Sequence, residues 1–356
     1  MNPKDINDKR TIKEFKSITF SGYKKSEAKK ELLNHLYLGK IEESCYWSAE
    51  FICAGQFLDI WDVLFLFMSK FIHLGNPKLP TYMELRFTDF KNIITGGYIG
   101  NELKLKNNNK IRRLFAEVIC LLCLSQKKSS FDIPKIKEEE YMATNISYKL
   151  KADSAFHAKS VFRKEDPNEL FIAINELSWT IDLKNKNSTN AYYWIEWLLG
   201  YEKIMKQNKK NIIAASRNYP VETKFKTDII WLIWNVIQQE SLKRNKAIEK
   251  IITSLINLFC TRYQPGCKKK RKSILYFAIA LLTEPYEKKI PIITNKALVE
   301  KVVSKIDVIY KQIKKNEITP DTDYLFKGFN SGNLEKTISK LETMESLTNM
   351  LPRNNK

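Results

Sequence analysis

Apolar residues recur at intervals of three and four along most of the chain, the spacing that places them on one face of an α-helix. Segments 32–37 and 248–259 are clear examples. The alternation of apolar and polar residues that marks a half-buried strand is scarce. Segment 141–151 is the main strand candidate, and residues 96–100 are expected to form a loop or hairpin turn. The pattern therefore predicts an all-α protein with at most one short hairpin.

Three sequence matches in the same order along the chain indicate an internal duplication. Residues 45–52 align with 191–198, residues 59–61 with 228–231, and residues 114–124 with 275–282. These matches predict two tandem, related helical units, residues 27–150 and 151–320. The alternative interpretation is that aromatic-rich buried helices simply look alike.

Both ends of the chain are poor in large apolar groups. Segments of this kind bury too little apolar surface to offset the entropy that ordering costs. A flexible basic tail is therefore expected over residues 1–26, and a polar tail over residues 321–356.

The composition indicates a folded protein with an anionic partner. The 356 residues are 44% hydrophobic, which is ample for a packed core. Lys and Arg number 60 against 40 Asp and Glu, and the resulting formal net charge of +20 favours nucleic acid or an anionic surface as the partner. The apolar stretches fall short of the ~20 residues of a membrane-spanning helix. The N-terminus lacks the apolar core of a secretory signal, so synthesis in the cytosol without membrane insertion is expected.

Positive charge is concentrated in the second half, where residues 202–272 contain 17 Lys and Arg against five Asp and Glu. Residues 268–272 are all cationic and precede a predicted helix over 273–282, where positive charge opposes the helix dipole. Helix stability does not explain this run, whereas phosphate binding or a nuclear-localisation signal would. The alternative is a set of ordinary solvated lysines. The candidate nucleic-acid-binding residues, expected on one face, are Lys243, Arg244, Lys246, Lys268, Lys269, Lys270, Arg271 and Lys272.

No recognisable catalytic constellation, cofactor motif or metal site is present in the sequence. The histidines His35, His73 and His157 are scattered, and no Walker A, G-x-G-x-x-G, H-E-x-x-H or G-x-S-x-G motif occurs. Cys120 and Cys123 have the spacing of half a zinc site or a redox dithiol, but their apolar neighbours favour core thiols in a reducing compartment. The protein is therefore expected not to be an enzyme and to use no cofactor.

Aromatic and acidic residues share the same predicted helices. Tryptophans spaced by three residues, 194 with 197 and 231 with 234, favour core packing over stacking with nucleic-acid bases. Glu50 and Glu196 occupy matching positions of the two predicted units. A buried carboxylate needs a partner, so ion pairs with Arg86 or Arg113 are expected, the alternative being a metal or acid–base pair.

Two resemblances add to this interpretation. Segments 44–50, 70–80 and 191–197 together resemble a helical protein family encoded by large nucleocytoplasmic DNA viruses of algae and protists. This resemblance covers most of the chain and implies no particular activity. Residues 46–47, Gly55 and residues 73–77 are similar to a helical hairpin in the collar-type domain of clamp-loader-related ATPases. Without an ATPase module, that similarity implies a helical module for homo-oligomerisation or DNA transactions that does not hydrolyse ATP.

Two classes of function follow from these expectations. A nucleic-acid-associated accessory factor in viral replication, transcription or genome packaging would contact DNA or RNA phosphates through the basic residues between 243 and 272. A structural virion protein, such as a minor capsid or scaffold protein, would instead present its charge to acidic viral proteins or the inner membrane. The first class is favoured, with the host cytoplasm at the virus factory, the nucleus or the virion as the expected location.

Overall fold

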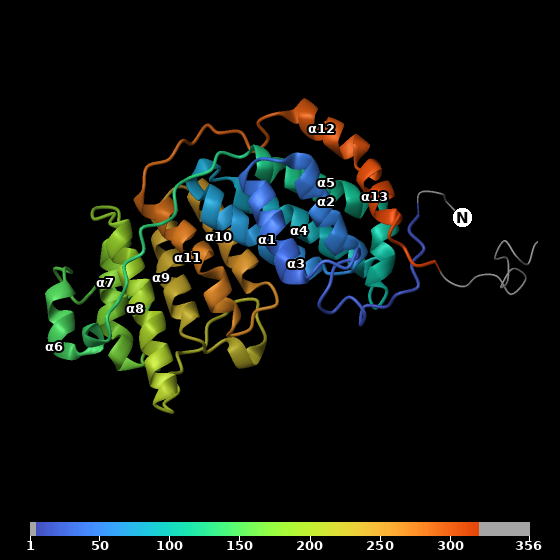
Figure 1. Cartoon of the computed structure of the whole chain (residues 1–356). Helices are drawn as coiled ribbons and strands as arrows, with labels where there is room; N and C mark the ends of the chain where they lie inside the picture. The colour runs from blue at the N-terminus through green and yellow to red at the C-terminus, as the bar shows by residue number, and fades with distance from the viewer. Residues whose placement is uncertain (1–4, 320–356) are drawn as a thin grey trace, which may run out of the picture.

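The computed structural model describes residues 5–319, and this range is built from α-helices joined by loops, short 3-10 turns and a π-helical turn (Met68–Ile72) (Figure 1). The helices are α1 (Lys25–Tyr37), α2 (Ile41–Cys53), α3 (Phe57–Phe67), α4 (Leu79–Thr95), α5 (Asn109–Leu124), α6 (Ala143–Ile146), α7 (Phe171–Ile181), α8 (Ser188–Gln207), α9 (Ile230–Leu242), α10 (Lys246–Cys260), α11 (Cys267–Thr283), α12 (Lys296–Lys305) and α13 (Asp307–Lys314). Over these residues no β-strand occurs, and the one isolated bridge joins Ile18 to Lys24. The all-α prediction is confirmed.

The candidate strand over 141–151 is wrong. The segment forms part of a 3-10 turn (Glu138–Tyr141), then α6, and then a second 3-10 turn (Ser147–Lys149). Local hydrogen bonds favour these turns: the Asn145 amide donates to the Glu139 carbonyl at 2.9 Å, and the Ser147 hydroxyl donates to the Thr144 carbonyl at 2.8 Å. Polar side chains that bond nearby backbone in this way compete with strand pairing.

One helix lies at the centre of each half of the molecule. Helix α5 contacts α1, α2 and α4 in the first half, and α11 contacts α7, α8, α9 and α10 in the second. Every residue of α11 from 273 to 283 is buried. A helix that is buried on all sides takes partners from every direction, so α11 brings the elements of the second half together.

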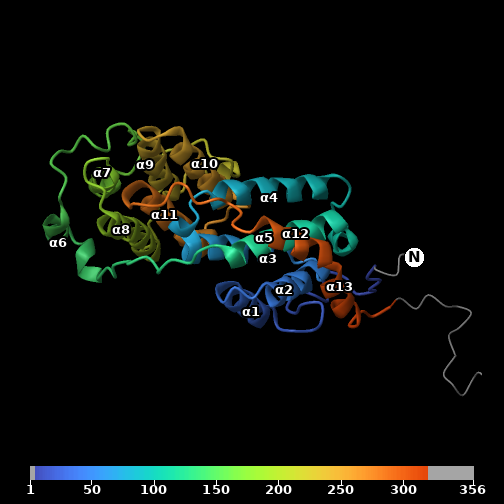
Figure 2. The ribbon, with the colours of Figure 1, turned by 90° about the horizontal axis from the view of Figure 1, so that it is seen from above.

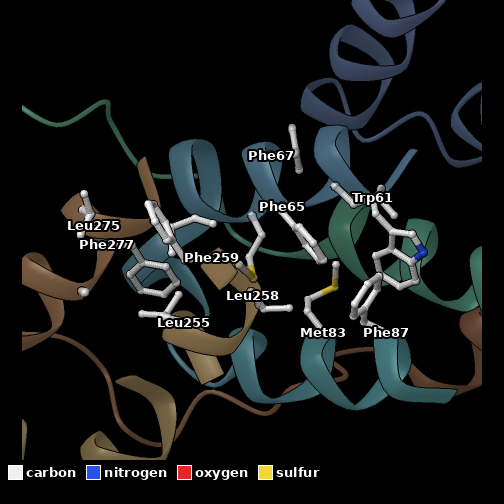
Figure 3. Close-up of a cluster of buried hydrophobic side chains, with 14 of the residues drawn as sticks. Trp61, Phe65, Phe67, Met83, Phe87, Leu255, Leu258, Phe259, Leu275 and Phe277 are labelled. Carbon is white, nitrogen blue, oxygen red and sulfur yellow. The ribbon is translucent and has the colours of Figure 1, made fainter. Parts of the chain in front are cut away.

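The two halves share one hydrophobic core. Helix α10 packs against α4, and α11 packs against α3. Figure 3 shows side chains from these four helices meeting in a single cluster, with Phe65 of α3, Met83 of α4 and Leu258 of α10 near its middle. Helices α12 and α13, expected in the second unit, return to the first half and pack against α5 and α2 (Figure 2).

Packing within the two halves follows a parallel pattern. The pairs α1–α2, α1–α3, α2–α5 and α4–α5 have the counterparts α7–α8, α7–α9, α8–α11 and α10–α11. The three matched sequence segments lie in α2 and α8, in α3 and at the start of α9, and in α5 and α11. A duplicated helical unit predicts this correspondence. Superposition of residues 27–150 on 151–320 stays a prediction.

The N-terminal segment differs from the expected flexible tail, because residues 5–24 pack against the first half. Ile6, Phe15 and Phe20 are buried at 1% exposure or less. The segment also supplies the partners of Glu50, whose carboxylate accepts hydrogen bonds from the Thr19 hydroxyl at 2.8 Å and the Ser21 backbone N–H at 2.9 Å. The expected pairing of Glu50 with Arg86 or Arg113 is therefore wrong. Residues 1–4 and the tail expected over 321–356 lie outside the described residues.

Other core predictions are confirmed. The tryptophans at 61, 194, 197, 231 and 234 are all buried. Burial raises the pKa of the Cys120 and Cys123 thiols to about 11, so both behave as apolar core groups rather than reactive thiolates. Within residues 5–319, no helix combines the length and the hydropathy needed to cross a lipid bilayer.

Candidate functional site

A large basic cleft lies on the second half of the molecule, with a volume of about 1230 Å³. It is bounded by the C-terminal half of α8, the first residues of α11, and segments 133–136, 210–213 and 224–228. The chain between α5 and α6, which includes residues 133–136, runs along the molecule towards α8 (Figures 1 and 2). Small-molecule sites span roughly 300–1,000 Å³. The cleft therefore has room for a larger ligand.

Lysines dominate the charged lining of this cleft: eight lysines face three carboxylates, and no arginine takes part. Five of the lysines are exposed and make no ion pair with any residue in the range 5–319. These free lysines are Lys135, Lys203, Lys206, Lys210 and Lys269. An open cleft lined by one sign of charge concentrates oppositely charged ligands.

Lys268 is held on the floor of the cleft by two carboxylates. Its ammonium lies 2.6 Å from both carboxylate oxygens of Glu202 and 3.0 Å from Asp228 Oδ1. The Tyr263 hydroxyl donates to the other Asp228 oxygen at 2.8 Å. Burial raises the pKa of Glu202, and the nearby Lys268 charge only partly offsets this. Lys268 is thus a structural cation, neutralised by the protein itself.

Lys272 has the same role one helical turn further along α11. Its ammonium lies 2.6 and 2.7 Å from the two carboxylate oxygens of Glu196, which also accepts a hydrogen bond from the Tyr276 hydroxyl. Glu196 therefore faces the cleft, whereas its predicted repeat counterpart Glu50 is covered by residues 19–21. The two halves differ here: the N-terminal segment fills this position in the first half.

Arg271 points away from the cleft and closes the C-terminal end of α10. Its guanidinium donates to the carbonyls of Phe259 and Thr261, and lies 3.0 Å from Asp62 Oδ1 on α3. The side chain is almost fully buried. Lys270 is exposed but does not line the cleft. Of the five cations at 268–272, only Lys268, Lys269 and Lys272 line it.

The remaining predicted site residues lie at the opposite end of the hairpin formed by α10 and α11. Arg244 donates to the Ile181 carbonyl at 2.7 Å and reaches the Leu282 carbonyl at the end of α11. Ten residues of helix separate Leu282 from Lys272, or about 15 Å along the axis. The prediction that Lys243, Arg244 and Lys246 share one face with residues 268–272 is wrong, because the antiparallel hairpin places the two groups at different ends.

Those three residues also differ from one another in their surroundings. Lys243 pairs with Glu240 and lies 3.7 Å from Asp182, and the Arg244 side chain is buried beside Glu240. Lys246 is exposed at the start of α10. Of these three residues, only Lys246 forms no ion pair with any residue of the described range 5–319.

Apolar side chains alternate with the lysines inside the cleft. Ile133 and Ile213 are 36% and 60% exposed, so their apolar surfaces face the open space. Phe225 and Tyr141 add half-buried rings. The Tyr141 ring rests on Trp197, with centroids 5.6 Å apart. The cleft thus offers apolar contact surface beside its positive charge.

Gly200 gives Tyr141 the space to lie against α8. A Cβ atom at Gly200 would come within 1.8 Å of the Tyr141 hydroxyl oxygen, far inside van der Waals contact. Gly in a helix interior costs about 1 kcal/mol relative to Ala. Gly200 therefore lets the 133–141 segment approach α8 closely but lowers the stability of that helix.

We expect Gly200→Ala to destabilise the protein by roughly 1 kcal/mol or more, because the steric clash outweighs the gain in helix propensity. In a Tyr141→Ala background the same substitution should stabilise by up to about 1 kcal/mol, since only the helix term remains. Urea unfolding of the four proteins measures both effects. Equal effects of Gly200→Ala in the two backgrounds would show that Tyr141 does not pack on Gly200.

The stretch singled out for its charge contains most of the cleft lysines, but four of the five free lysines were not among the predicted site residues. Lys203 and Lys206 lie three residues apart in the last turns of α8, and Lys210 follows three residues after the helix ends, all within the stretch singled out for its charge. The spacing of Lys203 and Lys206 puts those two on one helix face and was the available signal. Lys135 comes from a distant segment, and the residues around it in the sequence did not mark it as a site residue.

Residues 5–319 contain no group of three or more His, Cys, Asp or Glu side chains placed to hold a metal ion. Comparison with family models, with curated proteins and with solved structures gave no match. The resemblances to the viral family and to the collar-type domain stay predictions. The function is therefore inferred from the geometry of the cleft.

Proposed function

We propose that the protein is a non-catalytic nucleic-acid-binding factor that holds the phosphate backbone in the cleft between α8 and the start of α11. The observation that carries this proposal is the set of five exposed lysines without ion pairs around one large open cleft. An accessory role in the replication, transcription or packaging of a viral genome would fit such binding and rests on the resemblance to the viral family.

Charge pairing inside the cleft supports the proposal. Lys268 and Lys272 already neutralise the carboxylates of Glu202, Asp228 and Glu196. The five free lysines form no ion pair with any residue of the described range 5–319 and are available to a ligand. Each phosphate contact made by a lysine releases counterions, which makes binding strongly salt-dependent.

We expect the triple variant Lys203→Gln/Lys206→Gln/Lys210→Gln to bind DNA and RNA oligonucleotides roughly tenfold or more weakly than the wild type at low salt. Loss of three phosphate contacts should reduce the slope of log affinity against log salt by about two units. These side chains are exposed and unpaired, so stability should change by less than about 0.5 kcal/mol. Fluorescence anisotropy across a salt series measures affinity and slope together.

A matched control removes the same charge elsewhere. Lys246→Gln/Lys250→Gln/Lys301→Gln takes three exposed lysines from α10 and α12, none with an ion pair to residues 5–319. This control should keep nearly wild-type affinity. An equal loss in both triple variants would mean that net charge, not the cleft, determines binding. If the wild type shows no salt-dependent binding, the proposed function falls and the virion-structural alternative replaces it.

A further inference from the structure

We infer that the cleft takes single-stranded nucleic acid, with phosphates on the lysines at and just beyond the end of α8 and bases on the apolar side chains of the cleft. This inference rests on the proposed function and narrows its ligand. The juxtaposition that carries it is the exposed pair Ile133 and Ile213 in the same cleft as Lys203, Lys206 and Lys210.

Exposed apolar groups in a charged cleft need a ligand that is both anionic and apolar. A duplex presents its phosphates outward and hides the faces of its bases in the stack, so Ile133, Ile213 and Phe225 would gain little from it. Single strands expose base faces, and binders of single strands combine a positive groove with apolar and aromatic contact surfaces. The cleft has both features side by side.

An acidic polypeptide is the other ligand that carries negative charge along a flexible chain. Lysine and arginine both bind carboxylates and phosphates, so the all-lysine set of free cations in the cleft does not separate the two ligands. The exposed Ile133 and Ile213 do separate them, because the side chains of a run of Asp and Glu carry no flat apolar face, whereas the bases of a nucleic acid do. The apolar surface therefore favours nucleic acid.

Two chain segments that line the cleft also fit an extended strand. They are segment 133–136 and segment 210–213, which follows α8. Both contribute a lysine and an exposed isoleucine: Lys135 with Ile133, and Lys210 with Ile213. A strand long enough to contact both segments meets a cation and an apolar side chain at each.

The test compares an oligothymidylate of about 15 nucleotides, a duplex of the same length and polyglutamate. We expect the wild type to bind the single strand at least tenfold more tightly than the duplex, and polyglutamate more weakly still. Ile133→Ser/Ile213→Ser should lower single-strand affinity roughly threefold to tenfold with an unchanged salt slope, because no phosphate contact is lost. Phe225→Ala should act in the same direction.

The double isoleucine variant keeps the test independent of folding, because both side chains are exposed. Its matched control is Ile99→Ser/Ile172→Ser, which removes isoleucines that are 70% and 48% exposed outside the cleft and should bind as the wild type does.

Equal or tighter binding of the duplex overturns the single-strand inference while the proposed function stands. Preferred binding of polyglutamate overturns both, and so does the absence of any binding. If the double isoleucine variant binds the single strand as tightly as the wild type does, the bases do not contact these apolar side chains, and the inference is overturned.

Discussion

Replacing Asp166 with alanine is expected to lower the free energy of unfolding by about 3–5 kcal/mol, because it leaves a buried guanidinium without its counter-ion. Asp166 and Arg217 are buried to 0% and 2% side-chain exposure, and their closest N–O distance is 2.7 Å. The Asp166 carboxylate also accepts hydrogen bonds from the backbone N–H groups of Arg163 and Ala215, both at 2.8 Å. The pair thus joins the chain before α7 to the chain before α9.

The pH dependence of stability gives a second readout of the same group. Burial raises the pKa of Asp166, but the Arg217 guanidinium and the two backbone N–H groups outweigh it and hold the pKa below its usual value. A depressed folded-state pKa contributes stability above the unfolded-state pKa of about 3.9, and this contribution is lost as the pH falls through the folded value. As the pH falls below about 4, Asp166→Ala should therefore lose less stability than the wild type loses.

A matched control is Asp153→Ala, which removes a carboxylate that is 77% exposed and lies 2.7 Å from the His157 ring. Exposed pairs of this kind contribute little to stability, because solvent screens the interaction. Thermal and urea unfolding at pH 7 measure both variants. If Asp166→Ala is no less stable than Asp153→Ala, the buried pair does not hold these two segments together.

The helical class and the core tryptophans were predictable because both depend on local periodicity. Tryptophans spaced by three residues within an apolar helix lie on one buried face regardless of the rest of the chain. The N-terminal segment was not predictable in this way. Ile6, Phe15 and Phe20 are isolated apolar residues among lysines, and they become ordered only through distant contacts such as the Gln56 amide with the Ile18 carbonyl at 2.7 Å.

The candidate site was predictable as a region but not as a set of residues. Charge density alone located the stretch 202–272, which supplies most of the cleft lysines. Whether a given lysine is free depends on carboxylates far away in sequence: Glu202 is 66 positions from Lys268, and Glu196 is 76 positions from Lys272. The cations at the N-terminus of α11 had no explanation in the neighbouring sequence, because the α8 carboxylates that pair with them belong to another helix.

Replacing Arg271 with alanine is expected to lower the free energy of unfolding by about 2–4 kcal/mol, because the buried guanidinium bonds to backbone carbonyls and a carboxylate. The substitution leaves the Phe259 and Thr261 carbonyls at the end of α10 without their donor and removes the ion pair with Asp62, which is partly exposed and contributes less.

Lys270→Ala is the matched control, since its exposed side chain has no ion pair among residues 5–319 and should change stability by less than about 0.5 kcal/mol. Urea unfolding ranks the two variants, and oligonucleotide binding under native conditions should be unchanged in both, because neither side chain lines the cleft. Equal stability of the two variants would show that Arg271 does not cap α10. Weaker oligonucleotide binding by Lys270→Ala would show that the nucleic-acid interface extends beyond the cleft.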